Sequence, residues 1–264
     1  MFKYIIWVVK ICIPVLWDLF TWMWPYGRRP DRYSQEKRRL KGQKLAKRVL
    51  KSFKVDVEVR NMPIFNRDEV YYFVSNHTSV MDLVVLFSIL PLPISFISKD
   101  ENRKIPFVRT LMKVYKGLYI ERNNLHQEIK VMQEMRDSLA KKEVSWLIFP
   151  EGTRNKDYHG SLLDYKAGAF KAPLSTQTSI APIVQWGNQV IMPLKNRARR
   201  YKVIVEFLPL VKLEGTTQEI ANEIYKVSNK TMMKLREEYF ALQSAYKPNK
   251  HVRKLIALPT DETN

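Results

Sequence analysis

Seven short apolar runs, separated by helical stretches, dominate the chain from residue 55 onward. The runs are rich in Val, Ile, Phe and Tyr, as is typical of β-strands. Strands that alternate with helices predict an α/β fold, because the connecting helices cover both faces of a sheet. We therefore expect a mixed, mostly parallel sheet flanked by helices. The expected strands are 55–59, 70–74, 94–97, 117–120, 144–149, 180–184 and 203–207. The expected helices from residue 34 onward are 34–53, 82–90, 125–142 and 217–242.

The first 24 residues are strongly apolar and hold four of the six tryptophans of the chain. Lys3, Lys10 and Asp18 interrupt this segment, which makes it too polar for a simple membrane span. On a helix that advances about 100° per residue, these polar residues share one narrow arc and leave a wide apolar face. We expect a helix that lies in the surface of a bilayer, and a core or dimer helix is the alternative. The tryptophans expected to contact the membrane are Trp7, Trp17, Trp22 and Trp24.

The chain carries a formal net charge of +19, which implies an anionic partner. Residues 28–54 hold twelve Lys or Arg against two acids, a net charge of +10 directly after the tryptophan-rich segment. Each cation near anionic lipid contributes about 1 kcal/mol to membrane binding. No recognisable RNA-binding motif accompanies these cations, so we expect an anionic membrane surface and no nucleic acid as the partner. This predicts a peripheral, monotopic protein on the cytoplasmic face of a membrane.

The pattern along the chain predicts three parts. A two-helix membrane-binding element is expected at 1–54, and Ser34 is the expected N-cap of its second helix. The α/β domain is expected at 55–247 and a tail at 248–264. One cysteine, Cys12, excludes an internal disulfide, and no Cys or His cluster has the spacing of a metal site. We therefore expect no metal.

His77 and Asp82 form a His-x4-Asp pattern just after the strand expected at 70–74. A histidine beside a carboxylate is the base half of a hydrolase triad, yet the chain has no Gly-x-Ser-x-Gly motif to supply a nucleophile. The hydroxyl group of a substrate is then the expected nucleophile. Residues five apart on a regular helix point about 140° apart, so the two side chains meet only if the chain turns between them. The alternative is a capping or packing histidine and an acid that compensates a helix dipole.

Two further strand ends carry polar residues. The sequence Phe-Pro-Glu-Gly-Thr-Arg at 149–154 puts a carboxylate, a hydroxyl and a guanidinium on a tight turn. The sequence Gly-Leu-Tyr-Ile-Glu-Arg at 117–122 also ends a strand with a cation. A guanidinium suits bidentate recognition of phosphate. Arg122 and Arg154 are therefore candidates to clamp one phosphate near His77.

These motifs resemble the ordered blocks of the glycerolipid acyltransferase family, and most closely those of its 1-acyl-glycerol-3-phosphate acyltransferases. The blocks are Asn-His-x4-Asp at 76–82, the two strand-end motifs, and Ala-Pro-Ile at 181–183. The chain departs from the second block of the family by having Tyr119 and Glu121 where Phe and Asp are common. The resemblance implies that His77 is a general base and that Asp82 orients it. The residues implied to bind the phosphate and glycerol of the acceptor are Lys99, Arg122, Glu151, Gly152, Thr153 and Arg154.

The activity that the resemblance implies is transfer of an acyl chain from a thioester to the sn-2 hydroxyl of 1-acyl-sn-glycerol-3-phosphate (lysophosphatidic acid). The product would be phosphatidic acid, in phospholipid biosynthesis. The implied co-substrate is acyl-CoA or an acyl-carrier protein, with no other cofactor. Alternatives within the family are transfer to glycerol-3-phosphate or to another lysophospholipid. An alternative of a different class is a basic peripheral protein that binds RNA or anionic lipid without chemistry.

Overall fold

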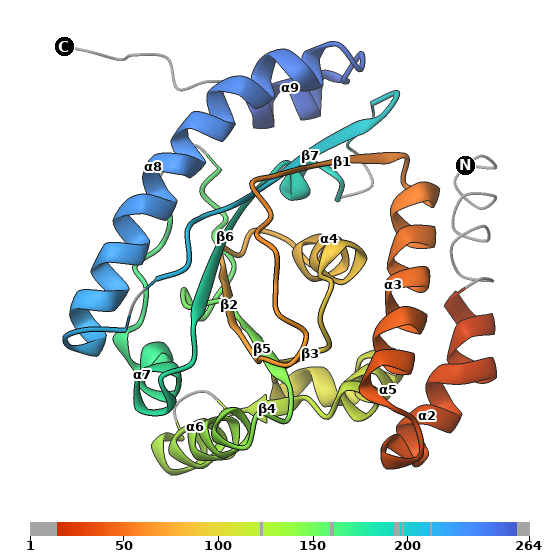
Figure 1. The fold of residues 1–264 in the computed structure, drawn as a ribbon. Helices are drawn as coiled ribbons and strands as arrows, with labels where there is room; N and C mark the ends of the chain where they lie inside the picture. Colours follow the sequence, from red (N-terminus) through yellow and green to blue (C-terminus); the bar gives the residue numbers. More distant parts are fainter. Residues whose placement is uncertain are drawn as a thin grey trace.

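The computed structural model describes residues 15–121, 124–158, 161–192, 196, 198–211 and 213–257. Its centre is a seven-stranded sheet with the order β1-β7-β6-β2-β5-β3-β4 (Figure 1). Neighbouring strands are parallel except β6 and β7, which are antiparallel. The mixed, mostly parallel sheet expected from the sequence is confirmed. The strands are β1 (Val55–Arg60), β2 (Tyr72–Ser75), β3 (Ile94–Lys99), β4 (Leu118–Ile120), β5 (Ser145–Ile148), β6 (Ile180–Trp186) and β7 (Tyr201–Phe207).

Helices precede, connect and follow these strands. The α-helices are α2 (Trp24–Arg28), α3 (Gln35–Ser52), α4 (Met81–Ile89), α5 (Pro106–Tyr115), α6 (Leu125–Ala140), α7 (Lys171–Thr176), α8 (Thr217–Ser244) and α9 (Lys250–Ile256). Five short 3₁₀ or π segments add to them: η1 (Leu19–Met23), η2 (Pro30–Arg32), η3 (Asp100–Lys104), η4 (Ala167–Phe170) and η5 (Asn188–Val190). The four helices expected from the sequence correspond to α3, α4, α6 and α8.

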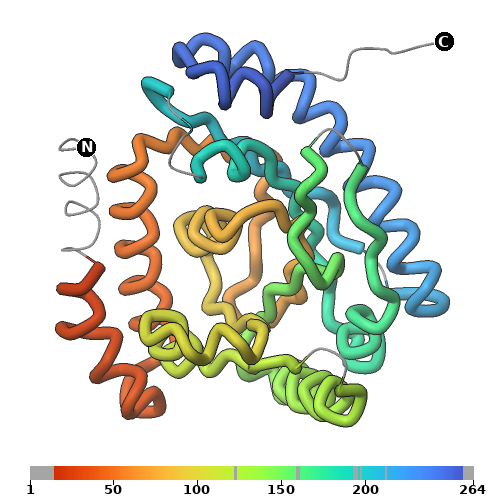
Figure 2. The backbone as a smooth tube through the Cα atoms, turned by 180° about the vertical axis from the view of Figure 1, so that it is seen from behind, coloured from red at the N-terminus to blue at the C-terminus, as the bar shows by residue number. Residues whose placement is uncertain are grey.

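The sheet is buried on both faces, and successive residues of a strand enter different cores. In β2, Phe73 lies in the core on one face, whereas Tyr72 and Val74 lie in the core on the other face. This alternation follows from the two-residue repeat of a β-strand. Helices α3, α4 and α5 complete the first core, and α6, α7, α8 and α9 complete the second (Figure 1, Figure 2).

Helix α3, expected as part of a separate membrane element, packs directly on the α/β core. Ser34 caps it as predicted, because its side-chain oxygen accepts the N–H of Lys37 at 3.2 Å. Leu45 and Leu50 on its inner face are buried in the first core. A Cβ at Gly42 would lie 1.7 Å from the Tyr115 hydroxyl of α5, so only glycine permits this approach. The inner face of α3 is therefore part of the folded core.

Helices α5, α7 and α9 were not predicted from the sequence. Helix α5 begins at Pro106, whose fixed φ suits the first turn of a helix, and it buries Met112 and Val114. Helix α9 falls in the expected tail, where Val252 and Ile256 are buried in the second core beside α8. The first part of that tail is therefore docked on the domain.

Candidate active site

The carboxyl ends of five parallel strands meet at one edge of the sheet. Strands β5 and β6 run parallel to β2, β3 runs parallel to β5, and β4 runs parallel to β3. His77 follows β2, the turn at 149–154 follows β5, and Lys99 ends β3. Open α/β sheets bind their ligands at this edge. The topology therefore brings the motifs found in the sequence to one side of the molecule.

His77 and Asp82 are joined by a hydrogen bond of 2.8 Å between Nδ1 and Oδ2. The chain turns at Thr78 and Ser79 before α4 begins, which is the geometry that their spacing requires. Asp82 lies in the first turn of α4, where the helix dipole favours a negative charge. The two side chains thus meet across the entry to a helix.

The Asp82 carboxylate is fully buried and collects several donors from this turn. Its Oδ2 also accepts the main-chain N–H groups of Thr78 at 2.7 Å and of Ser79 at 2.8 Å. The His77 ring stacks on Phe149, with 4.1 Å between the ring centroids, and its side chain is 19% exposed. Because Asp82 binds Nδ1, Nε2 is the ring nitrogen that remains to take a substrate proton.

Glu151 braces the main chain of His77. Its Oε1 accepts the N–H of His77 at 2.6 Å, and its Oε2 accepts the N–H of Leu163 at 3.2 Å. The N–H of Asn155 donates to the carbonyl oxygen of His77 at 2.7 Å. Glu151 is 3% exposed. Each carboxylate oxygen of Glu151 thus accepts a main-chain N–H, and the role in the glycerol pocket stays a prediction.

Burial raises the pKa of Glu151 from 4.5 to about 7, although the N–H groups of His77 and Leu163 act to lower it. The folded chain therefore keeps this proton over a pH range in which the unfolded chain has lost it. We expect the free energy of unfolding to fall by about 3 kcal/mol through this group between about pH 4 and about pH 8. Glu151→Gln removes this component because an amide does not titrate. Urea denaturation of both proteins across that range measures the difference.

The control for this prediction is Glu134→Gln, at an exposed position of α6. This variant should keep the pH dependence of the parent protein. If the Glu151→Gln and parent curves ran parallel, the buried titration of Glu151 would be excluded.

The outer part of the 149–154 turn is open to solvent. Gly152 has a φ of +66°, which glycine adopts without strain, and a Cβ there would lie 3.0 Å from Lys166 Nζ. Thr153 and Arg154 are exposed. Their side chains and the Lys166 ammonium are therefore available to an incoming ligand at this rim.

Tyr158 also belongs to this neighbourhood and was not predicted from the sequence. Burial raises the pKa of the Tyr158 phenol, the negative charge of Asp82 raises it further, and the Arg154 guanidinium lowers it. All three groups are therefore close enough to interact. No motif marks Tyr158, so only its position a few residues after Arg154 could have drawn attention to it.

Two of the predicted phosphate-binding cations, Lys99 and Arg154, lie at or after the ends of neighbouring strands. Lys99 is partly buried at the end of β3, and Arg154 follows β5, the strand next to β3. Arg122 lies outside the described residues. The Arg103 guanidinium, not predicted from the sequence, lies 4.2 Å from the centroid of the Tyr119 ring. In the described part of the chain, no three His, Cys, Asp or Glu side chains gather closely enough to hold a metal ion.

In the described part of the N-terminal segment, residues 15–24, the side chain of Asp18 faces the protein. Asp18 is only 4% exposed, accepts the Nε1–H of Trp22 at 2.9 Å, and forms an ion pair with Arg48 of α3. Trp22 is buried, with 3% exposure, and packs edge-on against Tyr26. The membrane-facing position predicted for Trp22 is therefore wrong, because Trp22 is buried beside Asp18, and Asp18 faces Arg48 rather than water.

The opposite side of this segment is apolar and exposed. Trp17 and Phe20 are 67% and 68% exposed, and Trp24 is 52% exposed. Trp7 lies outside the described residues. Within the ranges that the structure describes, the helices lack the length and apolarity needed to cross a bilayer.

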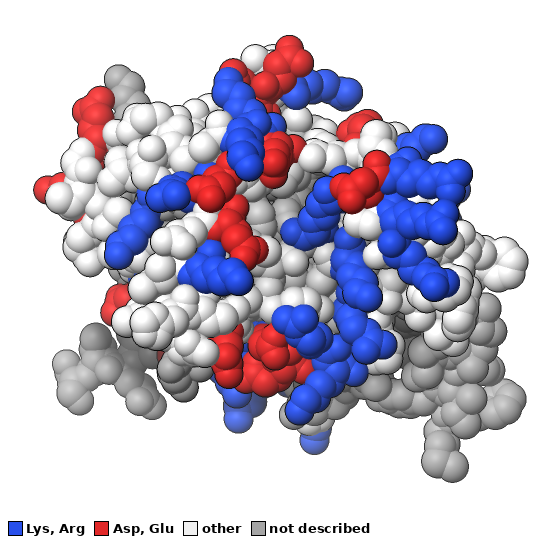
Figure 3. Space-filling model, turned by 90° about the horizontal axis from the view of Figure 1, so that it is seen from below, with Lys and Arg blue, Asp and Glu red and all other residues white. Residues whose placement is uncertain are grey.

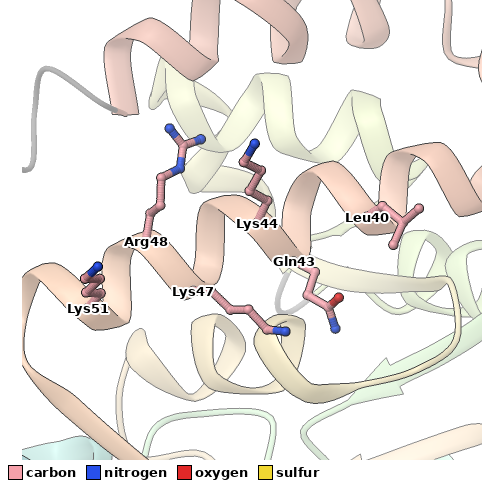
Figure 4. Close-up of a pocket in the computed structure, with 6 residues that line it drawn as sticks. All are labelled: Leu40, Gln43, Lys44, Lys47, Arg48 and Lys51. Carbon is pink, nitrogen blue, oxygen red and sulfur yellow. The ribbon is translucent and has the colours of Figure 1, made fainter.

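The outer face of α3 carries a stripe of cations (Figure 4). Residues three or four apart lie on one side of a helix, so the stripe follows the helix axis. It lines a groove of about 310 Å³. The lining residues are Leu40, Gln43, Lys44, Lys47, Arg48 and Lys51. Seen from below, Lys and Arg side chains also gather on the side of the molecule where α2 and α5 lie (Figure 3).

Comparison with known proteins shows which proteins this chain is similar to. A family model described as Acyltransferase matches residues 56–186. The human 1-acyl-sn-glycerol-3-phosphate acyltransferase alpha is 33% identical over 166 residues, which cover 62% of this chain and 58% of the human protein. The chloroplastic 1-acyl-sn-glycerol-3-phosphate acyltransferase LPAT1 of Arabidopsis thaliana is 34% identical over 142 residues, or 53% of this chain and 38% of that protein. The matches thus span 58% of the human protein and 38% of the Arabidopsis protein, less than two thirds of the length of either relative.

A solved structure has the same fold. The crystal structure of the 1-acyl-sn-glycerophosphate (LPA) acyltransferase PlsC from Thermotoga maritima matches with a TM-score of 0.68 and 22% sequence identity. The match covers 88% of this chain and 92% of that one. The region of this chain that is similar to the Acyltransferase family, residues 56–186, holds the turns that carry His77, Asp82 and Glu151.

Proposed function

We propose that this chain transfers an acyl group from a thioester to the sn-2 hydroxyl of 1-acyl-sn-glycerol-3-phosphate and so forms phosphatidic acid. The observation that carries the proposal is the 2.8 Å hydrogen bond between Asp82 and Nδ1 of His77, which orients a general base. The sequence has no Gly-x-Ser-x-Gly motif, which favours a substrate hydroxyl as the nucleophile. The human and Thermotoga maritima relatives carry the same acceptor in their names.

In the proposed reaction, Nε2 of His77 removes the proton of the acceptor hydroxyl as its oxygen attacks the thioester carbonyl carbon. A C–O bond forms, and the carbonyl electron pair moves onto oxygen. Return of that pair breaks the C–S bond, and the imidazolium gives its proton to the departing thiolate. Asp82 keeps a proton on Nδ1 and stabilises the imidazolium. The reaction needs no covalent acyl-enzyme.

We assign the acceptor phosphate to Arg154, Lys99 and Arg122. Cations at the ends of β3 and β5 support this assignment, because both strands end at the edge that carries His77. Holding the phosphate fixes the acceptor hydroxyl near the base, and such positioning contributes several kcal/mol of barrier reduction. Gly152 and Thr153, at the open rim of the 149–154 turn, remain candidates for the glycerol. The donor is acyl-CoA or an acyl-carrier protein, both of which carry thioesters.

An acceptor competition assay tests the proposal. Purified protein in liposomes receives a radiolabelled acyl-CoA or acyl-carrier protein together with lysophosphatidate, glycerol-3-phosphate or another lysophospholipid. The expected product is labelled phosphatidate from lysophosphatidate. Labelled product from glycerol-3-phosphate, with lysophosphatidate untouched, would assign the alternative acceptor. Binding of RNA or lipid with no transfer from either donor would favour the non-enzymatic alternative.

We further propose that the N-terminal segment and α3 bind the surface of an anionic, cytoplasm-facing membrane. Exposed Trp17, Phe20 and Trp24 supply apolar contacts, and amphipathic indole rings favour the headgroup region. The cations on the outer face of α3 supply attraction to anionic lipid. A long-chain acceptor remains in a leaflet, so membrane binding brings the site to its substrate. In this proposal, residues 1–54 act as the membrane-binding element of the 55–247 domain.

Replacing Trp17, Phe20 and Trp24 together by serine should weaken vesicle binding. Loss of three exposed apolar side chains is expected to lower the partition coefficient by at least about tenfold. Flotation with vesicles that contain phosphatidylglycerol measures the bound fraction. The matched control replaces three exposed apolar residues of α8, which are Val227, Phe240 and Leu242. Equal flotation of the two triple variants would rule out a specific role for the N-terminal segment.

A further inference from the structure

A side-chain amide beside His77 completes the hydrogen bonding of a neighbouring strand. Asn76 Oδ1 accepts the main-chain N–H of Gln185 at 2.8 Å, and Asn76 Nδ2 donates to the main-chain oxygen of Gln185 at 2.9 Å. Strand β2 ends at Ser75, whereas the neighbouring β6 continues to Trp186. The Asn76 amide therefore takes the position that the next peptide group of β2 would have occupied.

Asparagine suits this position because its side chain offers one acceptor and one donor in a plane, as a peptide does. An ionised aspartate lacks the donor, and alanine has neither group. Asn76 and Gln185 are each 1% exposed, so water does not replace a lost bond there. Breaking the pair leaves a buried N–H and a buried carbonyl unsatisfied, which is costly.

The side chain of Gln185 forms hydrogen bonds with two further buried polar residues. Its Nε2 donates to Ser75 Oγ at 3.0 Å, and its Oε1 accepts Nδ2 of Asn188 at 3.1 Å. Ser75 and Asn188 are both completely buried. Four buried polar side chains thus join the end of β2 to the end of β6. Oδ1 of Asn188 has no hydrogen-bond partner, whereas the bonds among the other groups restrict the backbone at the two strand ends.

We propose that Asn76 and Gln185 form a clamp that sets the position of the His77 imidazole, which makes Asn76 a positioning residue for acyl transfer. Asn76 directly precedes His77, and Glu151 and Asn155 hold the main chain of His77 on its other side. The backbone at residue 77 is therefore fixed on both sides before any substrate binds. The role in acyl transfer rests on the proposed function, whereas the placement of the imidazole does not.

The test compares Asn76→Ala with a matched variant of another amide clamp. Gln243 of α8 is completely buried, accepts the main-chain N–H of Lys202 at 2.8 Å and donates to the main-chain oxygen of Arg200 at 3.0 Å. It holds the start of β7, which is separated from β2 by β6. Gln243→Ala therefore removes the same two kinds of bond without touching the His77 turn.

Two readouts are needed. The first is kcat and KM for lysophosphatidate in the full-length protein. The second is the rate at which diethyl pyrocarbonate modifies His77, followed by peptide mass spectrometry, with the exposed His126 and His251 as internal references. The second readout does not depend on the reaction that the protein performs.

Asn76→Ala should lower kcat by at least about 30-fold and change KM by less than about threefold, because a displacement near 1 Å is enough to cost about 10²-fold. Its His77 should be modified at least about fivefold faster than in the parent protein, once the ring is no longer held against Asp82 and Phe149. Gln243→Ala should keep kcat and the modification rate within about twofold of the parent.

Asn76→Asp takes the place of Asn76→Ala in the test if the alanine variant does not fold. A protonated aspartic acid offers a donor and an acceptor, so it restores the clamp, whereas the ionised form does not. Burial raises the pKa of the carboxyl group that Asn76→Asp introduces above its ordinary value of about 3.9. The ratio of the variant kcat to the parent kcat should therefore fall at least about tenfold as the pH rises from about 5.5 to about 8. A ratio that stays constant over this range would reject the clamp.

Further results would contradict the positioning role of Asn76. A kcat of Asn76→Ala within about twofold of the parent, or an equal loss in Gln243→Ala, would show that the amide pair serves general stability only. If the parent protein transferred no acyl group, the proposed function would fail, and the modification rates would still decide the placement of His77. Equal rates in Asn76→Ala and the parent would then overturn the clamp.

Discussion

His77→Ala is expected to lower the rate of acyl transfer to lysophosphatidate by about 10³-fold at saturating substrates. A positioned general base contributes about 10² to 10⁴-fold to a rate, and His77 is the residue whose Nδ1 is bound by the buried Asp82. The strand-end cations that we propose to bind the phosphate are unchanged in this variant, so KM for the acceptor should stay near the parent value. Initial rates with a radiolabelled thioester measure both constants.

The control for this variant is His126→Ala, at an exposed position of α6. This variant should keep the parent rate. Circular dichroism and thermal unfolding establish that both variants fold. Acyl transfer by His77→Ala within about tenfold of the parent would contradict the general-base role.

Asp82→Asn is expected to lower kcat by about 10²-fold, with a smaller effect on KM. The imidazole and the N–H groups of Thr78 and Ser79 all approach Oδ2 of Asp82. A neutral amide oxygen at that place accepts these bonds more weakly and does not stabilise an imidazolium. The turn also loses charge-assisted bonds, so the free energy of unfolding should fall by about 1 to 3 kcal/mol.

Urea denaturation and steady-state kinetics of the same preparation separate the two effects of Asp82→Asn. Asp68→Asn, at an exposed position before β2, should leave both quantities unchanged. A variant that is destabilised but retains the parent kcat would assign Asp82 to the structure of the turn only. An Asp82→Asn protein with both values unchanged would exclude the proposed pair altogether.

Much of the fold follows from patterns in the sequence that have a direct physical cause. Strands buried on both faces must be apolar throughout, and the expected runs at 70–74 and 144–149 overlap β2 and β5, which are entirely buried. The contact between His77 and Asp82 was also predictable, because five residues that enter a helix allow a turn. Helix α5 was not predicted, and a helix of ten residues depends for its stability on packing against its neighbours.

The parts of the site that were not predictable depend on which way a side chain faces. A helical wheel showed that Asp18 and its polar neighbours share an arc, but not that Arg48, 30 residues later, would meet Asp18 there. The motif at 149–154 located Glu151 at a strand end, but not its carboxylate beneath the His77 backbone. The pairing of Asn76 with Gln185 joins residues 109 apart in the chain, and no local pattern encodes it.

The strand order also affects how the chain reaches this structure. Strand β1 pairs only with β7 in the sheet, so Val55 cannot form its strand pairing until Tyr201 is present. Pairings between such distant segments must close long loops and therefore form slowly. On the ribosome, the first strand stays unpaired until almost the whole α/β region has been synthesised. The hydrogen bonds between Asn76 and Gln185 likewise form only after β6 has been synthesised, so the strand end that precedes His77 stays incomplete until then.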